Sequence, residues 1–342
     1  MYKLFNTIKD TTLYKQQPTQ NIGLDEVLEI SKTYYGSLLD VARPLLQFNQ
    51  TELTASLGGL TIGEANLVLR ECESQEVPLE YTVYAYPVSQ SWDMGIGTRF
   101  DDITSEGATW SWPSLNSTTW SLDGGDYLTS PSGSVDIQYL GSDLEIPMDD
   151  ILAGWMDASI PNNGVILKLS DDAESGSIDY GILQYFGKET NTIYQPKLRV
   201  GYDDSSFDIG TGSLQLMPLD SDDIHVTFKR LRSKYKLGST VKIIVVGREK
   251  YPLKQYTKLY SYTDIQYLPT TTWYQVKDAQ TDEIIIPFSD YSKVSCDSNG
   301  NYFNINFANW EYNRDYYLEI KTEINGSEYY FSEDNLVFTI EQ

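Results

Sequence analysis

The stretch Ile146–Leu169, which reads IPMDDILAGWMDASIPNNGVILKL, decides the fold of this chain. Its first half predicts a short helix, because apolar residues recur at three- and four-residue spacings and form one stripe: Met148, Ile151, Leu152, Trp155 and Met156. The run Pro161–Gly164 predicts a turn, and the alternation in Val165–Leu169 predicts a β-strand. Such a short helix is not stable alone, so we expect it to cover the end of a sheet that this strand enters, with Trp155 in the core.

Working outward from this stretch, short alternating segments separated by turn residues predict more strands. In the first part of the chain they are residues 3–15, Val27–Ser31, Ala42–Phe48, Ile62–Glu71, Leu79–Val88, Val135–Tyr139, Ile182–Phe186 and Lys197–Tyr202. The sequence has 27 tyrosines and 24 glycines, a composition that favours strands and turns over helices. Many short strands of this kind predict an all-β sandwich, and we expect the first domain to be residues 1–204.

The second half of the chain also predicts strands only. A linker rich in Ser, Gly and Asp, residues 205–223, precedes Ile224–Leu231, Thr240–Val246, Ile265–Leu268, Trp273–Lys277, Glu283–Phe288, Tyr302–Phe307, Tyr316–Ile324 and Val337–Glu341. Asn299-Gly300 and Asn325-Gly326 are typical of two-residue hairpin turns. Residues 224–342 are therefore expected to form a second, immunoglobulin-like sandwich.

A series of short motifs in residues 10–202 resembles the DNRLRE family. In chain order they are Asp-Thr-Thr-Leu-Tyr (10–14), Arg-Pro-Leu-Leu-Gln-Phe-Asn (43–49), Ala-Asn-Leu-Val-Leu (65–69), Ser-Trp-Asp (91–93), Gly-Ala-Thr-Trp (107–110), Gly-Gly-Asp-Tyr (124–127), Asp-Asp-Ile-Leu-Ala-Gly-Trp (149–155), Asn-Asn-Gly-Val-Ile-Leu-Lys (162–168) and Gln-Pro-Lys-Leu-Arg-Val (195–200). Domains of that family are jelly-roll sandwiches, similar to carbohydrate-binding modules, and occur in extracellular repeat proteins and in bacteriophage particles. The resemblance implies an N-terminal jelly roll with one short helix, in a structural protein of a tailed-phage virion.

Charge and composition narrow the class of protein. With 25 basic and 49 acidic residues the formal net charge is −24, which argues against general nucleic-acid binding. The N-terminal residues lack the features of a signal peptide, and no apolar run is long enough for a membrane span. We therefore expect a virion protein made in the host cytoplasm, with Cys72 and Cys296 as free thiols.

The sequence predicts no enzyme and no cofactor. His225 is the only histidine. This excludes catalytic arrangements that need a second histidine, and it excludes most zinc sites. Acidic pairs such as Asp149-Asp150 are adjacent in sequence, and neighbours on a strand point to opposite faces rather than toward one substrate. A polysaccharide-degrading enzyme stays open as a third interpretation. A structural calcium ion also stays open, held by Asp10 with Asp203 and Asp204.

The segment Ser89–Ser132 is unusually long for a loop and holds several tryptophans. Aromatic faces stack on sugar rings, so Trp92 and Trp112 are candidate carbohydrate-binding residues. The competing interpretation is that Trp110 and Trp120 pin the loop onto the sandwich by burying their large apolar area. Glycan binding is thus an alternative that we keep beside a purely structural loop.

The segment Lys229–Lys258 concentrates positive charge. It has ten basic residues and one acidic residue, a formal charge of +9 that leaves −33 on the rest of the chain. We predict an assembly interface in its second half, with the candidate residues Arg248, Lys250, Lys254 and Lys258. A solvated sheet edge is the alternative.

Together these observations predict a non-enzymatic structural protein in the neck, collar, tail or baseplate of a phage particle. It would assemble through protein–protein contacts with its own copies, in a ring, and with other virion proteins. The alternative function is a carbohydrate-binding or adhesive module on a virion or cell surface.

Overall fold

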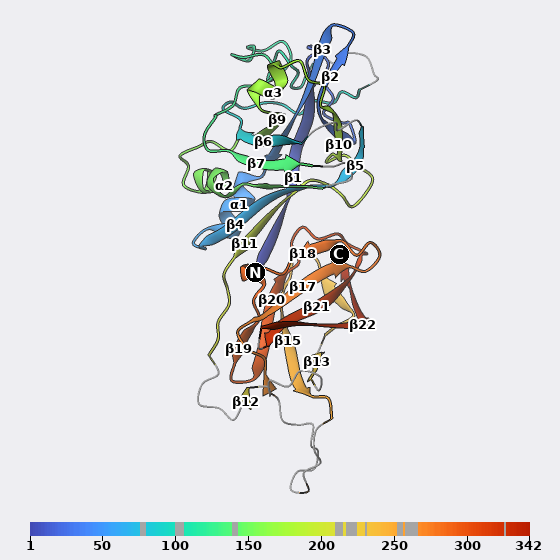
Figure 1. Cartoon of the computed structure of the whole chain (residues 1–342). Coiled ribbons are helices and arrows are strands. Elements are labelled where there is room, and N and C mark those ends of the chain that lie inside the picture. The colour runs from blue at the N-terminus through green and yellow to red at the C-terminus, as the bar shows by residue number, and fades with distance from the viewer. Residues whose placement is uncertain are drawn as a thin grey trace. The chain divides into compact units, whose positions relative to one another are not determined.

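The computed structural model describes residues 1–75, 80–99, 106–138, 143–208, 215–216, 224–229, 231–251, 256, 266–324 and 326–342. In these ranges the chain is mostly β-sheet, which confirms the predicted all-β class (Figure 1). Two compact units are present: a larger one, Phe5–Val200, and a smaller one made of Met1–Leu4 and Gly201–Gln342. The predicted linker 205–223 lies mostly outside the described residues, since only 205–208 and 215–216 are described.

The described part of the larger unit has a branched sheet of eleven strands. They are β1 (Tyr2–Tyr14), β2 (Val27–Tyr35), β3 (Leu38–Phe48), β4 (Ile62–Leu69), β5 (Glu71–Gln75), β6 (Tyr81–Pro87), β7 (Gly133–Ile137), β8 (Leu144–Pro147), β9 (Val165–Leu169), β10 (Gly181–Phe186) and β11 (Lys197–Tyr202). The main path runs β5–β10–β2–β3–β1–β11–β4–β8, and a second path runs from β3 through β9 and β6 to β7. The branch lies at β3, where Leu45 and Leu46 pair with β1 on one side and with β9 on the other. Strands β1 and β11 each contribute residues to both units.

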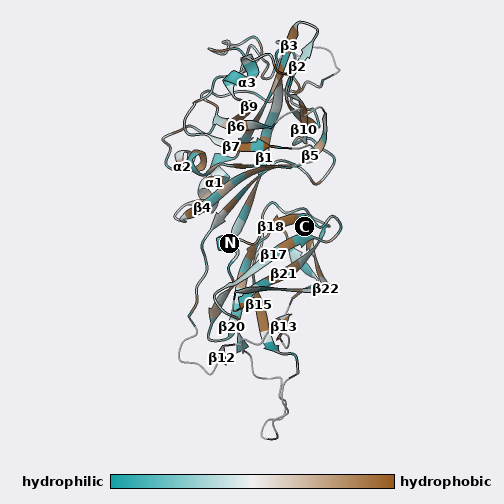
Figure 2. Ribbon diagram, in the orientation of Figure 1, coloured by the Kyte–Doolittle hydropathy of each residue, from teal (hydrophilic) through white to brown (hydrophobic). Residues whose placement is uncertain are grey.

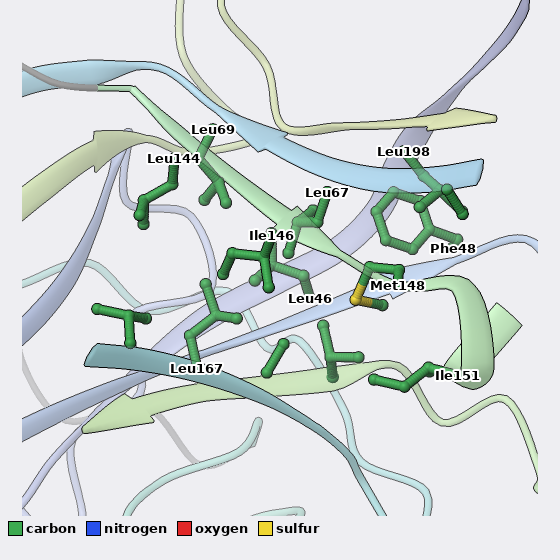
Figure 3. Close-up of a cluster of buried hydrophobic side chains, with 14 of the residues drawn as sticks. Leu46, Phe48, Leu67, Leu69, Leu144, Ile146, Met148, Ile151, Leu167 and Leu198 are labelled. Carbon is green, nitrogen blue, oxygen red and sulfur yellow. The ribbon is translucent and has the colours of Figure 1, made fainter. Parts of the chain in front are cut away.

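The core of the larger unit joins the two paths. Leu67 on β4 and Ile146 on β8 belong to the same buried cluster as Leu46 on β3 and Leu167 on β9 (Figure 3). Helices α1 (Gln50–Leu57) and α2 (Asp149–Met156) pack at one end of this core, and α3 (Asp171–Ser175) follows β9. Trp155 on α2 is 1% exposed, which confirms its predicted place in the core.

Strand β9 confirms the prediction from the opening stretch but is covered on both sides. Val165, Leu167 and Leu169 belong to the main core, whereas Ile166 belongs to a second apolar cluster. Lys168 is also buried. The second face is covered because the cluster around Trp92, Trp110 and Trp120 packs onto Ile166.

The smaller unit, as far as its residues are described, has two sheets. Its strands are β12 (Gln215–Leu216), β13 (Ile224–Lys229), β14 (Lys234–Lys236), β15 (Thr240–Glu249), β16 (Gln266–Tyr267), β17 (Thr272–Asp278), β18 (Ile284–Ile286), β19 (Ser295–Asp297), β20 (Gly300–Asn306), β21 (Asp315–Ile324) and β22 (Ser327–Glu341). One sheet has the order β12–β16–β15–β20–β19 with β13 also paired to β15, and the other has the order β14–β22–β21–β17–β18. Apolar residues of both sheets share one core, so the unit is β-sandwich-like. Strand β15 is rich in isoleucine and valine and is brown over much of its length in Figure 2.

The start of the chain belongs to this second core. Tyr2 and Leu4 are 1% and 5% exposed and pack with the buried side chains of the smaller unit. Of the two predicted hairpins, the one that joins β19 to β20 turns one residue earlier than expected, at Ser298-Asn299, because Asp297 pairs with Gly300, whose φ is 118°. In the other, Gly326 has a φ of 78° between the paired residues Ile324 and Ser327, and Asn325 lies outside the described residues.

Candidate functional site

The long loop after β6 covers the outer face of β3 and β9. Its buried side chains Trp92, Trp110 and Trp120 form one apolar cluster with residues of the sheet, including Ile166. The indole N–H of Trp92 donates to the carbonyl of Asn163 at 2.8 Å, and the indole N–H of Trp120 donates to a backbone carbonyl in its own loop at 2.9 Å. The loop is thus held by buried aromatic area with satisfied polar groups. Residues 100–105 of this loop lie outside the described ranges.

The two predicted sugar-binding residues lie in different environments. Trp92 is 3% exposed, and the Lys9 ammonium lies 5.8 Å from its ring centroid. A ring this deeply buried has no free face on which a sugar could stack, so the suggested role of Trp92 is corrected to packing. Trp112 is half-buried, and its carbonyl accepts from the Thr109 amide at 2.8 Å. Trp92 and Trp112 therefore do not form an exposed platform.

The side chain of Asn21 holds the loop through hydrogen bonds to its backbone. The sequence around Asn21 gave no sign of this role. Its side-chain NH₂ donates to the carbonyls of Met94 and Ala108, both at 2.8 Å, and its Oδ1 accepts from the Gly97 amide at 2.9 Å. A Cβ on Gly107 would lie 2.3 Å from Asn21 Nδ2, so the close approach requires glycine there. The glycines of the loop were the available signal for a close backbone approach. They did not identify Asn21 as the partner, because Asn21 lies more than seventy positions before the loop residues that it contacts.

A cluster of charged side chains, all but Asp171 largely removed from solvent, lies beside the loop on the outer face of β9. The Arg43 guanidinium donates to both carboxylate oxygens of Glu174, and the Lys168 ammonium lies 3.4 Å from the same carboxylate. Lys168, which is 1% exposed, also donates to Asp171 and, at 2.9 Å, to the Tyr127 hydroxyl. These contacts join the start of α3 to β3, β9 and the loop.

The electrostatics of this cluster favour an ion pair between Lys168 and Asp171. Burial by itself lowers the pKa of Lys168, but the hydrogen bond to Asp171 and the charge of Glu174 outweigh it and raise that pKa above its usual value. The hydrogen bond from Lys168 holds the pKa of Asp171 below its usual value. Lys168 and Asp171 thus stabilise each other's charged forms.

A second set of buried carboxylates lies on β1 and β2. Glu29, 3% exposed, accepts hydrogen bonds from Arg99 at 2.8 Å and from the hydroxyls of Tyr14 and Ser31 at 3.3 and 3.2 Å. Asp10, 1% exposed, accepts from the Lys188 amide, and burial raises the pKa of Asp10 to about 7. Neither carboxylate is open to a substrate, so this set does not form the exposed pair that glycoside hydrolysis requires.

The residues suggested for calcium have partners of their own. Asp10 belongs to the larger unit, whereas Asp203 and Asp204 belong to the smaller one. Asp203 accepts from Ser205, and Asp204 accepts from the Asn304 side chain at 3.2 Å. Within the described ranges, no group of three or more His, Cys, Asp or Glu side chains is arranged to hold a metal ion. Both cysteines are free thiols.

The basic segment lies on β13, β14 and β15 of the smaller unit. Of the predicted interface residues, Arg248 is half-buried and Lys250 is exposed beside Tyr251, whose side chain is 73% exposed. Lys254 and Lys258 lie outside the described residues. Four further cations are exposed where β13 ends and β14 begins, and we call them the basic edge: Lys229, Arg232, Lys234 and Lys236. Alternation in β14 was the signal for two of them, since Lys234 and Lys236 flank the buried Tyr235.

Comparison with known proteins identifies no family for this chain. No family model matches the sequence, and no curated protein matches it. Among solved structures, a DUF4785 family protein from Legionella pneumophila aligns over 98% of this chain and 65% of its own, with 10% identity and a TM-score of 0.21. A β-glucuronidase from Bacteroides uniformis aligns over 99% of this chain and 34% of its own, with 9% identity and a TM-score of 0.18. The chain thus spans less than two thirds of either protein, and similarity at this level carries no inference. Separately, no helix in the described part of the chain is long and apolar enough to cross a membrane.

Proposed function

We propose that this chain is a non-enzymatic structural protein of a tailed-phage particle, in the neck, collar, tail or baseplate, that assembles through protein–protein contacts. In this proposal the larger unit is a jelly roll of the DNRLRE type and the smaller unit is an immunoglobulin-like sandwich. The observation that carries the proposal is the separation of charge. A chain of net charge −24 presents exposed cations at one edge of its smaller unit.

Charge separation of this kind favours association with an acidic surface. Unlike patches steer two proteins together and set the register of their contact. Exposed ion pairs contribute only about 0–1 kcal/mol each, so apolar contacts must supply most of the binding energy. The basic segment also contains Tyr251 and Tyr256, whose side chains are 73% and 93% exposed and add apolar surface to it.

Buried carboxylates of the larger unit form internal hydrogen bonds, and this supports a structural role for that unit. Glu174 and Glu29 are each held by several donors from different elements, and their exposed fractions are 7% and 3%. Such groups fix the loop and α3 on the sheet. Their removal from solvent leaves them no contact with a substrate.

The alternative function, carbohydrate binding, has one observation in its favour. Tyr84, Tyr86 and Tyr127 are half-buried, and their rings stack in a row with centroid separations of 5.7 and 5.0 Å. A glycan array tests this alternative. Saturable binding that is lost in Tyr84→Ala/Tyr86→Ala would make carbohydrate binding the first interpretation.

The proposed function is tested by light scattering and by mass spectrometry. We expect the purified chain to form oligomers at low salt, and we expect added salt to weaken them because exposed charges are screened. We also expect peptides of the chain in purified phage particles. A chain that stays monomeric at all concentrations and is absent from particles would contradict the proposal.

A further inference from the structure

One end of the larger unit is acidic. Residues 50–69 and 143–164 contain no lysine or arginine, and they include α1, α2, β4 and β8, which lie together because α2 contacts both α1 and β4 and β8 pairs with β4. Their acidic residues are Glu52, Glu64, Asp143, Glu145, Asp149, Asp150 and Asp157. We call this surface the acidic end. It also carries an exposed apolar side chain, Leu60, at 38%.

Part of this negative charge has no cation beside it. Asp143 and Glu145 form ion pairs with Arg70 and Arg199. Among the described residues, Asp149, Asp150 and Asp157 form no ion pair, and all three are exposed. The dipole of α2 favours the acids of its first turn, Asp149 and Asp150, but it disfavours a carboxylate at the other end, where Asp157 lies. A cation from outside the unit would stabilise all three.

The basic edge carries exposed positive charge, in contrast to the acidic end. Among the described strands, β13 pairs with β15 and β14 pairs with β22, so each is an edge strand. Lysines on an edge strand prevent that strand from pairing with a strand of another chain. This is one reason why lysines occur on β13 and β14. Lys234 is also paired with Glu341, whereas Lys229 and Lys236 project from the ends of the two strands.

We infer that the basic edge of one copy binds the acidic end of a second copy of this chain. The inference rests on the proposed function, that the chain assembles with its own copies, and it adds the two surfaces that meet. The occupant is a second copy because both complementary surfaces, one with exposed cations and the other without any lysine or arginine in its two segments, belong to the same chain. A contact between unlike surfaces is heterologous, and its repetition gives a closed ring or an open filament.

Charge reversal on each side tests the contact. The edge variant is Lys229→Glu/Lys236→Glu, and the end variant is Asp150→Lys/Asp157→Lys. Each variant alone loses charge complementarity, because the edge then has two cations and two anions and the acidic end has two lysines among five acids. We therefore expect each variant alone to assemble less than the parent chain by light scattering. A mixture of the two restores unlike pairs, so we expect it to assemble again. This recovery also shows that both variants are folded.

Matched controls carry the same charge change elsewhere: Lys15→Glu/Lys293→Glu and Asp136→Lys/Asp172→Lys. Both are expected to assemble like the parent chain. If the parent and the end variant both assemble, the acidic end is not the partner, and only this inference is overturned. If both variants fail alone and the mixture does not recover, the inference is likewise overturned, and the basic edge has another acidic partner. A parent chain that never assembles overturns the proposed function as well.

Discussion

Burial changes the chemistry of the Asp10 carboxyl. Burial raises its pKa from 3.8 to about 7, although the Lys188 amide donates to the carboxylate. Between these two pH values the folded state holds a proton that the unfolded state has lost. The free energy of unfolding therefore falls as the pH rises from about 4 to about 7. Removing this charge should remove that part of the pH dependence.

The change that tests this is Asp10→Asn, which keeps an oxygen for the Lys188 amide. We expect the variant to be more stable than the parent above pH 7, by as much as about 4 kcal/mol for a shift of this size, and similar to it near pH 4. Urea unfolding at several pH values measures the difference. The exposed Asp136→Asn serves as control, and equal pH profiles for Asp10→Asn and the parent would contradict the assignment.

Single residues also show how far sequence reasoning reaches. Trp155 was predicted in the core because its neighbours form a helical stripe, which is a local pattern. Trp92 has no such pattern around it, and its burial depends on Ile166 and other residues far along the chain. Asn21 was missed for the same reason, since all its loop partners are distant.

At the scale of elements, strands were easier to predict than the short helices. α1 was missed although Asn49 caps it, with Oδ1 accepting from the amides of Thr51 and Glu52 at 3.0 and 3.3 Å. The pattern of Asn49 followed by Glu52 is a known start signal, but the helix is short and weakly amphipathic. Helix α2 was found because its apolar stripe is stronger and leads into a clear strand.

The loop over β3 and β9 is held by buried tryptophans and by hydrogen bonds to the Asn21 side chain. Asn21→Ala removes two donors and one acceptor from buried backbone groups, and an unsatisfied buried group costs about 1–3 kcal/mol. We expect the variant to lose at least about 2 kcal/mol of stability and to be cut faster by protease within residues 89–132. Asn191→Ala, at an exposed site, is the control. Unchanged proteolysis in Asn21→Ala would show that the tryptophans alone hold the loop.

At the scale of the whole molecule, the division of the chain differs from a simple split along the sequence. Residues 1–204 were predicted as the first domain, whereas Met1–Leu4 group with the smaller unit and the division at the other end falls after Val200. β1 is continuous from Tyr2 to Tyr14, so its strand pattern gives no sign of two cores. The alternation of buried and exposed side chains is interrupted at Leu4 and Phe5, which are consecutive and both buried. A β-bulge causes the same interruption, so this pattern alone does not indicate two cores.

Two substitutions on β1 test this division. Tyr2 and Phe5 lie three positions apart and are 1% and 2% exposed, but Tyr2 belongs to the core of the smaller unit and Phe5 to that of the larger unit. Truncation of a buried aromatic residue costs about 3–5 kcal/mol. We expect Tyr2→Ala to destabilise the smaller unit and Phe5→Ala to destabilise the larger one.

Hydrogen exchange measured by mass spectrometry separates the two effects. Peptides from β20 and β21 should lose protection in Tyr2→Ala, and peptides from β4 and β9 should lose it in Phe5→Ala. Each variant is thus the matched control of the other, with the same type of change on the same strand. Equal loss of protection throughout the chain in both variants would mean that the two units unfold together. Loss confined to the larger unit in Tyr2→Ala would instead assign the start of β1 to that unit's core.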